Sequence, residues 1–420
     1  MWPENCGYSA GGFGTMIFDV VVIGGGTGGI CTAARLKNCL PKLNIGIIEP
    51  SGTHNYQPLF TLFATGHVDA KQTHRPMSEV IPKGCHWIRD SVASIVPERN
   101  EITLSGGEVA GYRLLVVAPG LVTNFDSIGG LSSALNDRAH PLCSVYDSSN
   151  LQKCAKLAKD FLGGTMVFST PSTPIKCPSA PLKMLFLLED SLRRSGAREV
   201  SRLIFVTPFS SLLGIDGYRE TINALVLQRG IEVLFEHEVV SVDQRNREVL
   251  LRPCSISAAE RNIKSIRYDF AHITPAAQPP RFVADSGLHH ADGFFKDWLE
   301  VNPLTLQHTR WPNIFGLGDV AGLPSIKTAA AARSQSAVVA ANIQALIKSG
   351  GKAPLPKQYN GYSSCPIFTS AGEAIQTETG YDGRLLPTFP GNPFQPRKAF
   401  WWYNAHILPQ LYWKFLIRGH

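Results

Sequence analysis

An apolar run near the start of the chain predicts a buried strand. Residues 18–23, FDVVVI, are largely apolar and β-branched, as in a parallel strand that is covered on both faces. Gly24, Gly26 and Gly29 follow at once with the spacing G-x-G-x-x-G. Good helix formers then begin a helix at residues 32–36. The pattern therefore predicts a strand, a tight turn and a helix in close succession.

This succession predicts a dinucleotide-binding fold. The three glycines allow a tight turn, close approach of the main chain to a pyrophosphate, and close packing of helix on strand. The helix N-terminus favours the phosphate charge. A second apolar strand, NIGIIEP, ends in Glu49, 20 residues after Gly29, where an acid would hold a ribose 2′-hydroxyl. The alternative is a glycine-rich turn without a ligand, which the flanking strand and helix disfavour.

Two distant segments indicate which dinucleotide is bound. The segment YRLLVVAPG predicts a strand that ends in a tight turn at Gly120, and NIFGLGDVAG predicts a strand that leads to Asp319. Both features are similar to those of flavoproteins built from two dinucleotide folds, in which the aspartate holds the ribityl chain of FAD.

An alanine-rich helix is predicted after Asp319. It starts near Lys327 and Thr328 and is closed by Gly350 and Gly351. Its positive end and the lysine charge would stabilise the anionic edge of a reduced flavin. The alternative for Lys327 is a solvated lysine at the start of a helix.

A second nucleotide fold is predicted without its glycine fingerprint. Residues 164–170 and 203–207 read as its first two strands, but the turn 171–181, PSTPIKCPSAP, has four prolines and no glycine. Proline lacks the N–H that a pyrophosphate needs, so we expect no nicotinamide site there. Cys177 lies in this turn, between Lys176 and a helix start at 179–181, where a thiolate would be stabilised. The alternative is an ordinary buried cysteine.

Composition limits the remaining classes. The chain has 420 residues, a formal net charge of +7 and no Lys/Arg run, so we expect no nucleic-acid partner, while contact with anionic lipid stays open. The nine cysteines include no C-x-x-C motif, so no metal site is expected. Residues 1–16 hold no Lys or Arg and do not resemble a signal or transit peptide. No apolar run reaches the roughly 18 residues of a membrane-spanning helix.

The C-terminal stretch 399–420 is rich in aromatic residues. It contains three Trp, two Tyr and two Phe, and Pro409 divides it. Because Trp and Tyr prefer the headgroup layer, we expect two short amphipathic helices lying in one leaflet and opening a path for a quinone. The alternative is a helix packed on the protein's own core.

Six motifs together resemble the sulfide:quinone oxidoreductases, most closely the branch of animal and fungal mitochondria and some bacteria. They lie in the family's order over about residues 17–420: VVIGGGTGG, HNYQPLFTL, STPIKCPSAPLK, GLGDVAGLPSIKTAAA, YNGYSSCP and LYWKFLIRG. The two cysteine motifs and SIKTAAA are specific to this family. The glycine fingerprint and the Gly-Asp pair also occur in the type II NADH dehydrogenases.

The resemblance implies a flavoenzyme with a redox disulfide. Hydrogen sulfide would attack a Cys177–Cys365 disulfide, leaving a persulfide on Cys365 and a thiolate on Cys177 that reacts with FAD. A small acceptor (glutathione, sulfite or coenzyme A) would remove the sulfur, and ubiquinone would take the electrons. Lys327 is a further catalytic candidate. The residues expected to hold FAD are Gly24, Gly26, Gly29, Glu49, Gln57, Gly120, Asp319, Lys327 and Thr328.

The implied fold is α/β with two Rossmann-like folds, one FAD-binding and one degenerate, plus a membrane-associating helical end. We expect an FAD domain at 17–125 and 281–350, a second domain at 126–280 and the C-terminal region at 351–420. The expected location is the surface of the mitochondrial inner membrane, or alternatively a bacterial plasma membrane.

Three alternatives stay open. The chain could be a type II NADH:quinone oxidoreductase, or a protein that binds flavin or persulfide without catalysis. Cys143 lies about where bacterial members carry a third cysteine, so a three-cysteine mechanism or a covalent flavin link competes with an ordinary cysteine.

Overall fold

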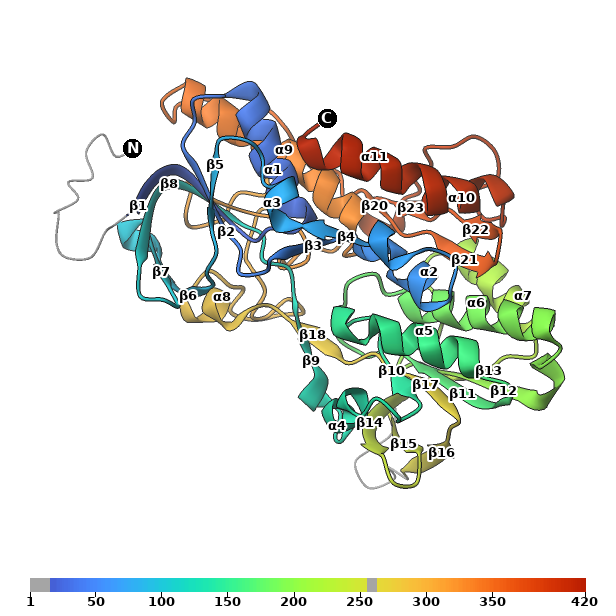
Figure 1. The fold of residues 1–420 in the computed structure, drawn as a ribbon. Helices are drawn as coiled ribbons and strands as arrows, with labels where there is room; N and C mark the ends of the chain where they lie inside the picture. The colour runs from blue at the N-terminus through green and yellow to red at the C-terminus, as the bar shows by residue number, and fades with distance from the viewer. Residues whose placement is uncertain (1–15, 255–262) are drawn as a thin grey trace.

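Two β-sheets, each with helices packed around it, form the body of the molecule (Figure 1). The structure is a computed structural model that describes residues 16–254 and 263–420. Cys6, to which the sequence assigns no role, lies outside the described residues. Among the helices described, none is long and apolar enough to cross a bilayer.

The first sheet brings together strands from both halves of the chain. Its order is β5-β2-β1-β8-β7-β6, and β19 pairs with the end of β8. All pairs are parallel except those of β6 and β7. The strands are β1 (Met16–Ile23), β2 (Ile45–Ile48), β5 (Cys85–Ile88), β6 (Val92–Val96), β7 (Glu101–Leu104), β8 (Val109–Val117) and β19 (Ile314–Gly316).

The register of this sheet gathers four turns at one edge. Ile23 pairs with Ile48 and with Val117, and Val117 pairs with Gly316. Because these strands are parallel and end level, the turns that follow them emerge side by side. The predicted strands at 18–23, 112–120 and 313–322 are thereby confirmed as neighbours in one sheet.

Helices α1 (Thr27–Cys39) and α9 (Ala329–Lys348) pack against each other on this sheet (Figure 1). Helix α1 begins at Thr27, five residues earlier than expected, because packing of the glycines overrides their poor helix propensity. A Cβ on Gly29 would lie 1.9 Å from the carbonyl oxygen of Gly24. Only glycine permits this contact. Helix α9 begins after Thr328, as predicted.

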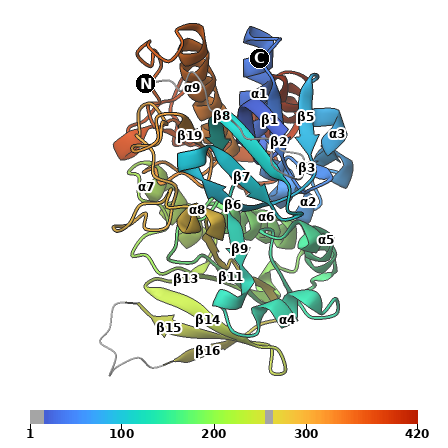
Figure 2. The ribbon, with the colours of Figure 1, turned by 90° about the vertical axis from the view of Figure 1, so that its left-hand side faces the viewer.

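The second sheet is entirely parallel, in the order β10-β17-β11-β12-β13. Strands β11 and β12 confirm the two strands expected of a second nucleotide fold. Figure 2 shows this sheet below the first, with β9 (Val122–Asn124) leading from one to the other. The strands are β10 (Leu142–Cys143), β11 (Gly164–Ser169), β12 (Ser201–Val206), β13 (Glu232–Leu234) and β17 (Phe270–His272).

A smaller sheet, four two-stranded ribbons and further helices surround the two main sheets in the part of the chain that the structure describes. A three-stranded antiparallel sheet contains β14 (His237–Asp243), β15 (Glu248–Pro253) and β16 (Lys264–Arg267). The paired ribbons are β3 (Thr53–Asn55) with β4 (His74–Pro76), β9 with β18 (Ala276–Gln278), β20 (Ser363–Ser364) with β23 (Glu378–Thr379), and β21 (Ile367–Ser370) with β22 (Glu373–Ile375). The other helices are α2 (Phe60–Ala64), α3 (Met77–Val80), α4 (Leu131–Asn136), α5 (Leu151–Asp160), α6 (Ala180–Ser195), α7 (Tyr218–Gln228) and α8 (Arg281–Asp285).

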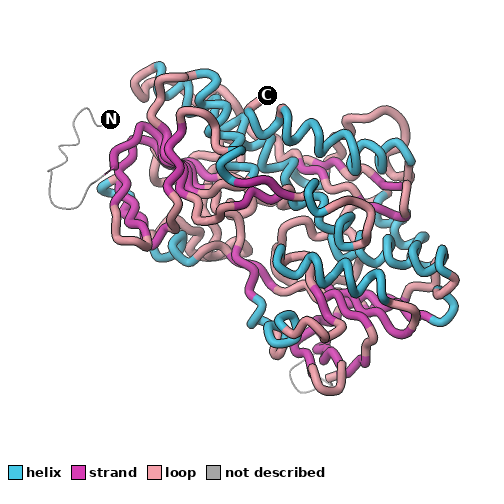
Figure 3. The backbone as a smooth tube through the Cα atoms, viewed as in Figure 1, coloured by secondary structure: helices cyan, strands magenta, loops and turns pink. Residues whose placement is uncertain are grey.

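The C-terminal segment is one helical rod rather than the two helices expected. Helix α10 (Lys398–Trp402) continues through a π-helical turn (Tyr403–Ile407) into α11 (Leu408–Lys414), and Figure 3 shows the rod unbroken. Pro409 lacks an N–H and clashes with the preceding turn in a regular α-helix. The wider π turn just before it accommodates the ring, so the helix continues through the proline.

The two faces of this rod differ in their surroundings. Phe400, Ala405 and Tyr412 join the hydrophobic core of the first sheet. Trp402 on the rod is 58% exposed, and Phe415, just past the end of α11, is 51% exposed. The helix therefore packs on the protein's own core and also presents an apolar outer face.

The contact at Gly29 generates a stability prediction. Gly29→Ala is expected to lower the free energy of unfolding by about 1–3 kcal/mol, because the new methyl group overlaps main chain that cannot move freely. Gly26→Ala is the matched control, since a Cβ there meets nothing within 4 Å, and it should stay within about 1 kcal/mol of the unmodified protein. Urea unfolding measures the free energy of unfolding of both variants. Equal losses in the two variants would contradict the close contact inferred at Gly29.

Candidate active site

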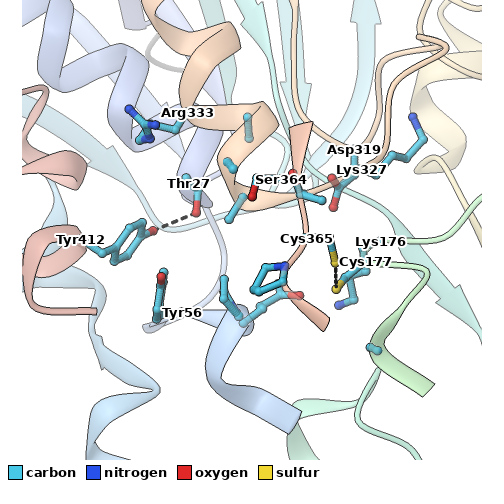
Figure 4. A pocket seen from close by; sticks show the side chains of 18 of the residues that line it. Thr27, Tyr56, Lys176, Cys177, Asp319, Lys327, Arg333, Ser364, Cys365 and Tyr412 are labelled. Carbon is cyan, nitrogen blue, oxygen red and sulfur yellow. Dashed lines mark hydrogen bonds between the residues drawn. The ribbon is translucent and has the colours of Figure 1, made fainter. Parts of the chain in front are cut away.

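A cavity of about 380 Å³ lies between the glycine turn of the first sheet, the turn after β11 and the C-terminal rod (Figure 4). Its volume is in the range of cofactor sites, roughly 300–1,000 Å³. Of the predicted site residues, those that line it are Gly26, Gln57, Gly120, Cys177, Asp319, Lys327, Thr328 and Cys365. Gly24, Gly29 and Glu49 do not line it.

Those three residues shape the glycine turn instead. Gly24 has φ +103°, and a Cβ on it would lie 2.2 Å from the carbonyl oxygen of Ala118. The Glu49 carboxylate accepts hydrogen bonds from the main-chain N–H of Gly25 and of Ser51, both at 2.7 Å. The glutamate therefore fixes the glycine turn, while its expected contact with a ribose hydroxyl stays a prediction. Gly26 lines the cavity at this turn.

The residues present fit a dinucleotide such as FAD. Gly26, the N-cap of α1, has no side chain to cap the helix, so the first-turn N–H groups are available to a phosphate beside the open space at Gly26. Asp319 lines the cavity, and its half-buried carboxylate has no hydrogen-bond partner among the described residues, which suits the hydroxyls of a ribityl chain. Burial raises the pKa of Asp319, against the opposing effect of Lys327 and Lys176.

A hydrogen-bonded chain ties the C-terminal rod to the glycine turn. His54 Nδ1 lies 2.7 Å from the carbonyl oxygen of Gly25, and His54 Nε2 lies 2.7 Å from the hydroxyl of Tyr412. Because a carbonyl can only accept, Nδ1 carries the proton and Nε2 accepts from Tyr412. That hydroxyl also lies 2.8 Å from Thr27 Oγ1 (Figure 4). Burial lowers the pKa of His54 to about 4, so the imidazole is neutral. Tyr412 was not foreseen from the sequence.

Lys327 is neither solvated nor directed at the cysteines. It is 7% exposed, its ammonium donates to the carbonyl oxygen of Ala321 at 2.8 Å, and it lies 4.2 Å from the centre of the Trp298 ring. Figure 4 shows the ammonium pointing away from the two sulfur atoms. Burial lowers its pKa to about 8, against the opposing effect of Asp319. The alternative of a solvated lysine is therefore wrong, and the side chain is engaged within the fold.

The structure brings Cys177 and Cys365 together from different parts of the chain. Their sulfur atoms lie 2.9 Å apart, although 188 positions separate them in sequence. Cys177 precedes α6, and Cys365 lies between β20 and β21. The hydroxyl of Ser179, the N-cap of α6, lies 2.8 Å from Cys365 Sγ. The start of α6 therefore contacts Cys365 as well as following Cys177.

The lysine beside the pair is Lys183, not Lys176. Lys183 lies in the first turn of α6, is 2% exposed, and its ammonium donates to Cys177 Sγ at 3.2 Å. This residue was missed, although a lysine six positions after the cysteine and inside the expected helix is a readable signal. No hydrogen bond joins Lys176 to either sulfur in the described part of the chain; burial lowers the pKa of Lys176.

The pKa values of the two cysteines shift in opposite directions. Hydrogen bonding from Cys177 lowers the pKa of Cys365 to about 5, and Lys183 and Ser179 add to the effect against the opposing cost of burial. The hydrogen bond to Cys365 and burial raise the pKa of Cys177 well above its usual range. The Lys183 ammonium lies beside Cys177 Sγ and the Ser179 hydroxyl lies beside Cys365 Sγ, so each sulfur has one polar neighbour from α6. The expectation that Cys177 carries the thiolate stays a prediction.

The main chain at Cys177 adopts a left-handed conformation, with φ +46°. This region is uncommon for residues other than glycine and is found at functional sites. The N–H of Cys177 donates to the carbonyl of Lys327 at 2.7 Å, and the Tyr146 hydroxyl donates to the carbonyl of Cys177 at 3.0 Å. These two contacts hold the sulfur toward Cys365. The main chain of Lys327 thus positions the cysteine.

The turn after β11 is filled by the protein's own carboxylate. The Ser172 N–H and hydroxyl donate to Glu238 Oε1 at 3.0 and 2.8 Å, and Arg252 lies 3.7 Å from Glu238 Oε2. The main-chain donor that a pyrophosphate would require is therefore already used. This observation supports the expectation that the second fold holds no nicotinamide.

Cys143 lies away from the cavity. It is fully buried on β10, and together with Cys154 of α5 it belongs to the core of the second sheet. The interpretation as an ordinary cysteine is favoured, because Cys143 does not line the cavity that contains Cys177 and Cys365.

The contact with Lys183 generates a titration prediction. In the reduced protein one thiolate is expected to form near pH 5, whereas burial holds the pKa of Cys85 at about 11 and that of Cys31 at about 12. Lys183→Met should raise the midpoint by about 1–3 pH units, since the cation that favours the thiolate is lost. Thiolate absorbance at 240 nm measures the step. Lys176→Met is the control. A larger shift of the thiolate midpoint in that variant would contradict the inference that Lys183 is the lysine that stabilises the thiolate.

Comparison with known proteins agrees with this geometry. Residues 18–160 match the family model of the pyridine nucleotide-disulphide oxidoreductases. The chain is 33% identical to the mitochondrial sulfide:quinone oxidoreductase of Mus musculus, over 96% of this chain and 87% of that one. It is 32% identical to that of Dictyostelium discoideum, over 96% and 86%.

A solved structure shares the fold across nearly the whole length. The sulfide:quinone oxidoreductase of Aquifex aeolicus superposes with a TM-score of 0.78, at 21% identity, over 97% of this chain and 92% of that one. The two curated relatives show the family at more than 30% identity. This chain therefore belongs to the sulfide:quinone oxidoreductases, a family of FAD-dependent oxidoreductases.

Proposed function

We propose that this chain oxidises hydrogen sulfide and reduces a quinone, with Cys177 and Cys365 as its redox pair. The observation that carries the proposal is the pair itself. Two sulfur atoms 2.9 Å apart share one buried ammonium, in the same cavity as the dinucleotide turn. Family membership supplies the substrate class, because the matched relatives are named for sulfide and quinone.

The sulfur chemistry starts from the disulfide form of the pair. Hydrosulfide attacks Sγ of Cys365, the S–S bond breaks, and Cys177 leaves as a thiolate while Cys365 keeps the new sulfur as a persulfide. Lys183, within 3.2 Å of Cys177 Sγ, stabilises the leaving thiolate. A small nucleophile such as glutathione, sulfite or coenzyme A then removes the outer sulfur from the persulfide. Cys365 Sγ is left as a thiolate.

The two electrons leave when the disulfide reforms. FAD, when bound, accepts such an electron pair and passes it to a quinone. Gly26 and the start of α1 would hold its pyrophosphate, and Asp319 its ribityl chain. Thr328, whose hydroxyl caps α9 through Ala331 N–H, aims the helix N-terminus into the cavity, where it favours negative charge.

The outer face of the C-terminal rod is proposed to meet lipid. Trp402, Leu411 and Phe415 are exposed there, and Lys398, Lys414 and Arg418 lie in the same segment. This combination favours an interfacial helix next to anionic headgroups. Since both curated relatives are named mitochondrial, we propose the mitochondrial inner membrane as the location, with ubiquinone arriving from the lipid.

Anaerobic sulfide titration tests the proposed function. Sulfide should bleach the flavin absorbance of the FAD-loaded protein, and a soluble quinone should restore it. Cys177→Ser and Cys365→Ser should each lower sulfide-dependent quinone reduction on the order of 10³-fold or more, because each removes a sulfur that forms or breaks a bond. Flavin reduction by NADH, with none by sulfide, would instead establish the alternative NADH dehydrogenase.

Two cysteine variants serve as controls for this experiment. Cys39→Ser changes an exposed thiol and Cys143→Ala changes a buried one, and both should keep the activity within a few-fold. Loss of activity in a well-folded Cys143→Ala protein would revive the three-cysteine mechanism. If FAD is firmly bound but no sulfur nucleophile bleaches its absorbance, the protein is non-catalytic.

Vesicle binding tests the proposed lipid contact. Sedimentation with phosphatidylcholine–cardiolipin vesicles should fall about tenfold or more in a Trp402→Ser/Phe415→Ser double variant, because two exposed apolar side chains no longer enter the lipid. Phe294→Ser removes a side chain that is 76% exposed in another loop, and should bind as the unmodified protein does. Equal binding by all three proteins would refute the lipid contact.

A further inference from the structure

One buried carboxylate in the cavity wall has no role in the sulfur chemistry. Glu378 begins β23, is 3% exposed and lines the cavity. A carboxylate is rarely buried without a compensating function or partner, because its removal from water costs several kcal/mol. Its surroundings therefore indicate what it does.

Three hydrogen bonds stabilise the charged form of Glu378. Oε1 accepts from the Tyr362 hydroxyl at 2.7 Å and from the Thr388 hydroxyl at 2.6 Å. Oε2 accepts from the Thr388 N–H at 2.8 Å. A carboxylate has roughly four acceptor positions, so Oε2 keeps one for a proton or a ligand in the cavity.

Glu378 directly follows a residue that contacts Cys365. The Thr377 hydroxyl donates to the Cys365 carbonyl, and the Cys365 N–H donates to the Thr377 carbonyl at 3.1 Å. The Glu378 carboxylate instead contacts Tyr362 and Thr388. Two adjacent residues thus hold the main chain of the nucleophile and supply the buried acid.

The wall around Glu378 suits a flat aromatic ring. Phe389, Tyr403 and Leu408 line the same cavity, and the last two belong to the C-terminal rod. In Figure 4 Tyr56 and Tyr412 lie on the opposite side of the cavity from Cys177. Aromatic and aliphatic side chains pack well on a quinone ring and its apolar tail.

Glu378 is the carboxylate on this side of the cavity, and the phenols around it hold their protons more tightly than usual. The pKa of Tyr362 is raised above its usual range by burial and by Glu378, and burial raises the pKa of Tyr403 and of Tyr218. The charge of Arg333 opposes the shift at Tyr362 and at Tyr403. The other carboxylate that lines the cavity is Asp319, which Figure 4 places beside the cysteines.

We propose that Glu378 is the acid that protonates the quinone during its reduction, an inference that rests on the proposed function. Reduction of a quinone to a quinol takes two electrons, which sulfide supplies, and two protons. The Glu378 O–H bond breaks, its proton goes to a quinone oxygen, and water reprotonates the carboxylate before the second transfer. The hydroxyls of Tyr362 and Thr388 and the Thr388 N–H stabilise the carboxylate between transfers.

The two half-reactions separate this role from the sulfur chemistry. In Glu378→Gln, flavin reduction by sulfide should stay within a few-fold of the unmodified rate. Reoxidation by a soluble quinone should slow about 10²-fold or more, because general acid catalysis contributes roughly 10²–10⁴. Reoxidation of the unmodified protein should show a solvent deuterium isotope effect, because an O–H bond breaks in the transfer. This isotope effect should be lost in the variant.

Glu373→Gln is the matched control, because it changes a glutamate on the neighbouring hairpin that does not line the cavity. Chemical reduction with dithionite before mixing with quinone makes the test independent of sulfide. A normal reoxidation rate in Glu378→Gln, or equal slowing in Glu373→Gln, would overturn the inference. Failure of sulfide to bleach the unmodified protein, with quinone reoxidation still dependent on Glu378, would overturn only the sulfide chemistry.

Discussion

The site depends on one buried charge interaction, between the Lys183 ammonium and the sulfur pair. Neither partner is stable alone at this depth, because an isolated buried ion costs several kcal/mol. Lys183 is 2% exposed and lies 3.2 Å from Cys177 Sγ, so a negative sulfur beside it is favoured. The cysteines are therefore poised for thiolate chemistry by a residue of α6, in the same turn of helix that ends the proline-rich loop.

The proline-rich loop positions a cysteine where a nicotinamide-binding fold would bind a phosphate. In a nicotinamide-binding fold the turn after the first strand offers its N–H groups to phosphate. Here the Ser172 N–H is used by Glu238, and the chain reaches Cys177 in a left-handed conformation held by Tyr146 and by the Lys327 carbonyl. The second sheet thus serves to position a sulfur atom at the cavity of the first.

The C-terminal rod couples the outer surface to the cofactor turn. Its inner face supplies Tyr412, which hydrogen-bonds to His54 and lies beside Thr27 at the start of α1. Trp402 is exposed on the rod, and Phe415 is exposed just past its end. A single helical segment therefore contacts the glycine turn on one side and presents aromatic side chains to the outside.

The sequence by itself determined the parallel strands, the glycine turn, the α9 start and the two candidate cysteines, because local periodicity and short motifs encode them. Only the tertiary structure decided that the two sulfur atoms lie together, which lysine lies beside them, and where Lys327 points. It also decided that the helix passes Pro409 and that Glu378 lies in the cavity. Contacts between residues far apart in sequence fix these features, since burial and partner distance set a pKa and no local pattern records either.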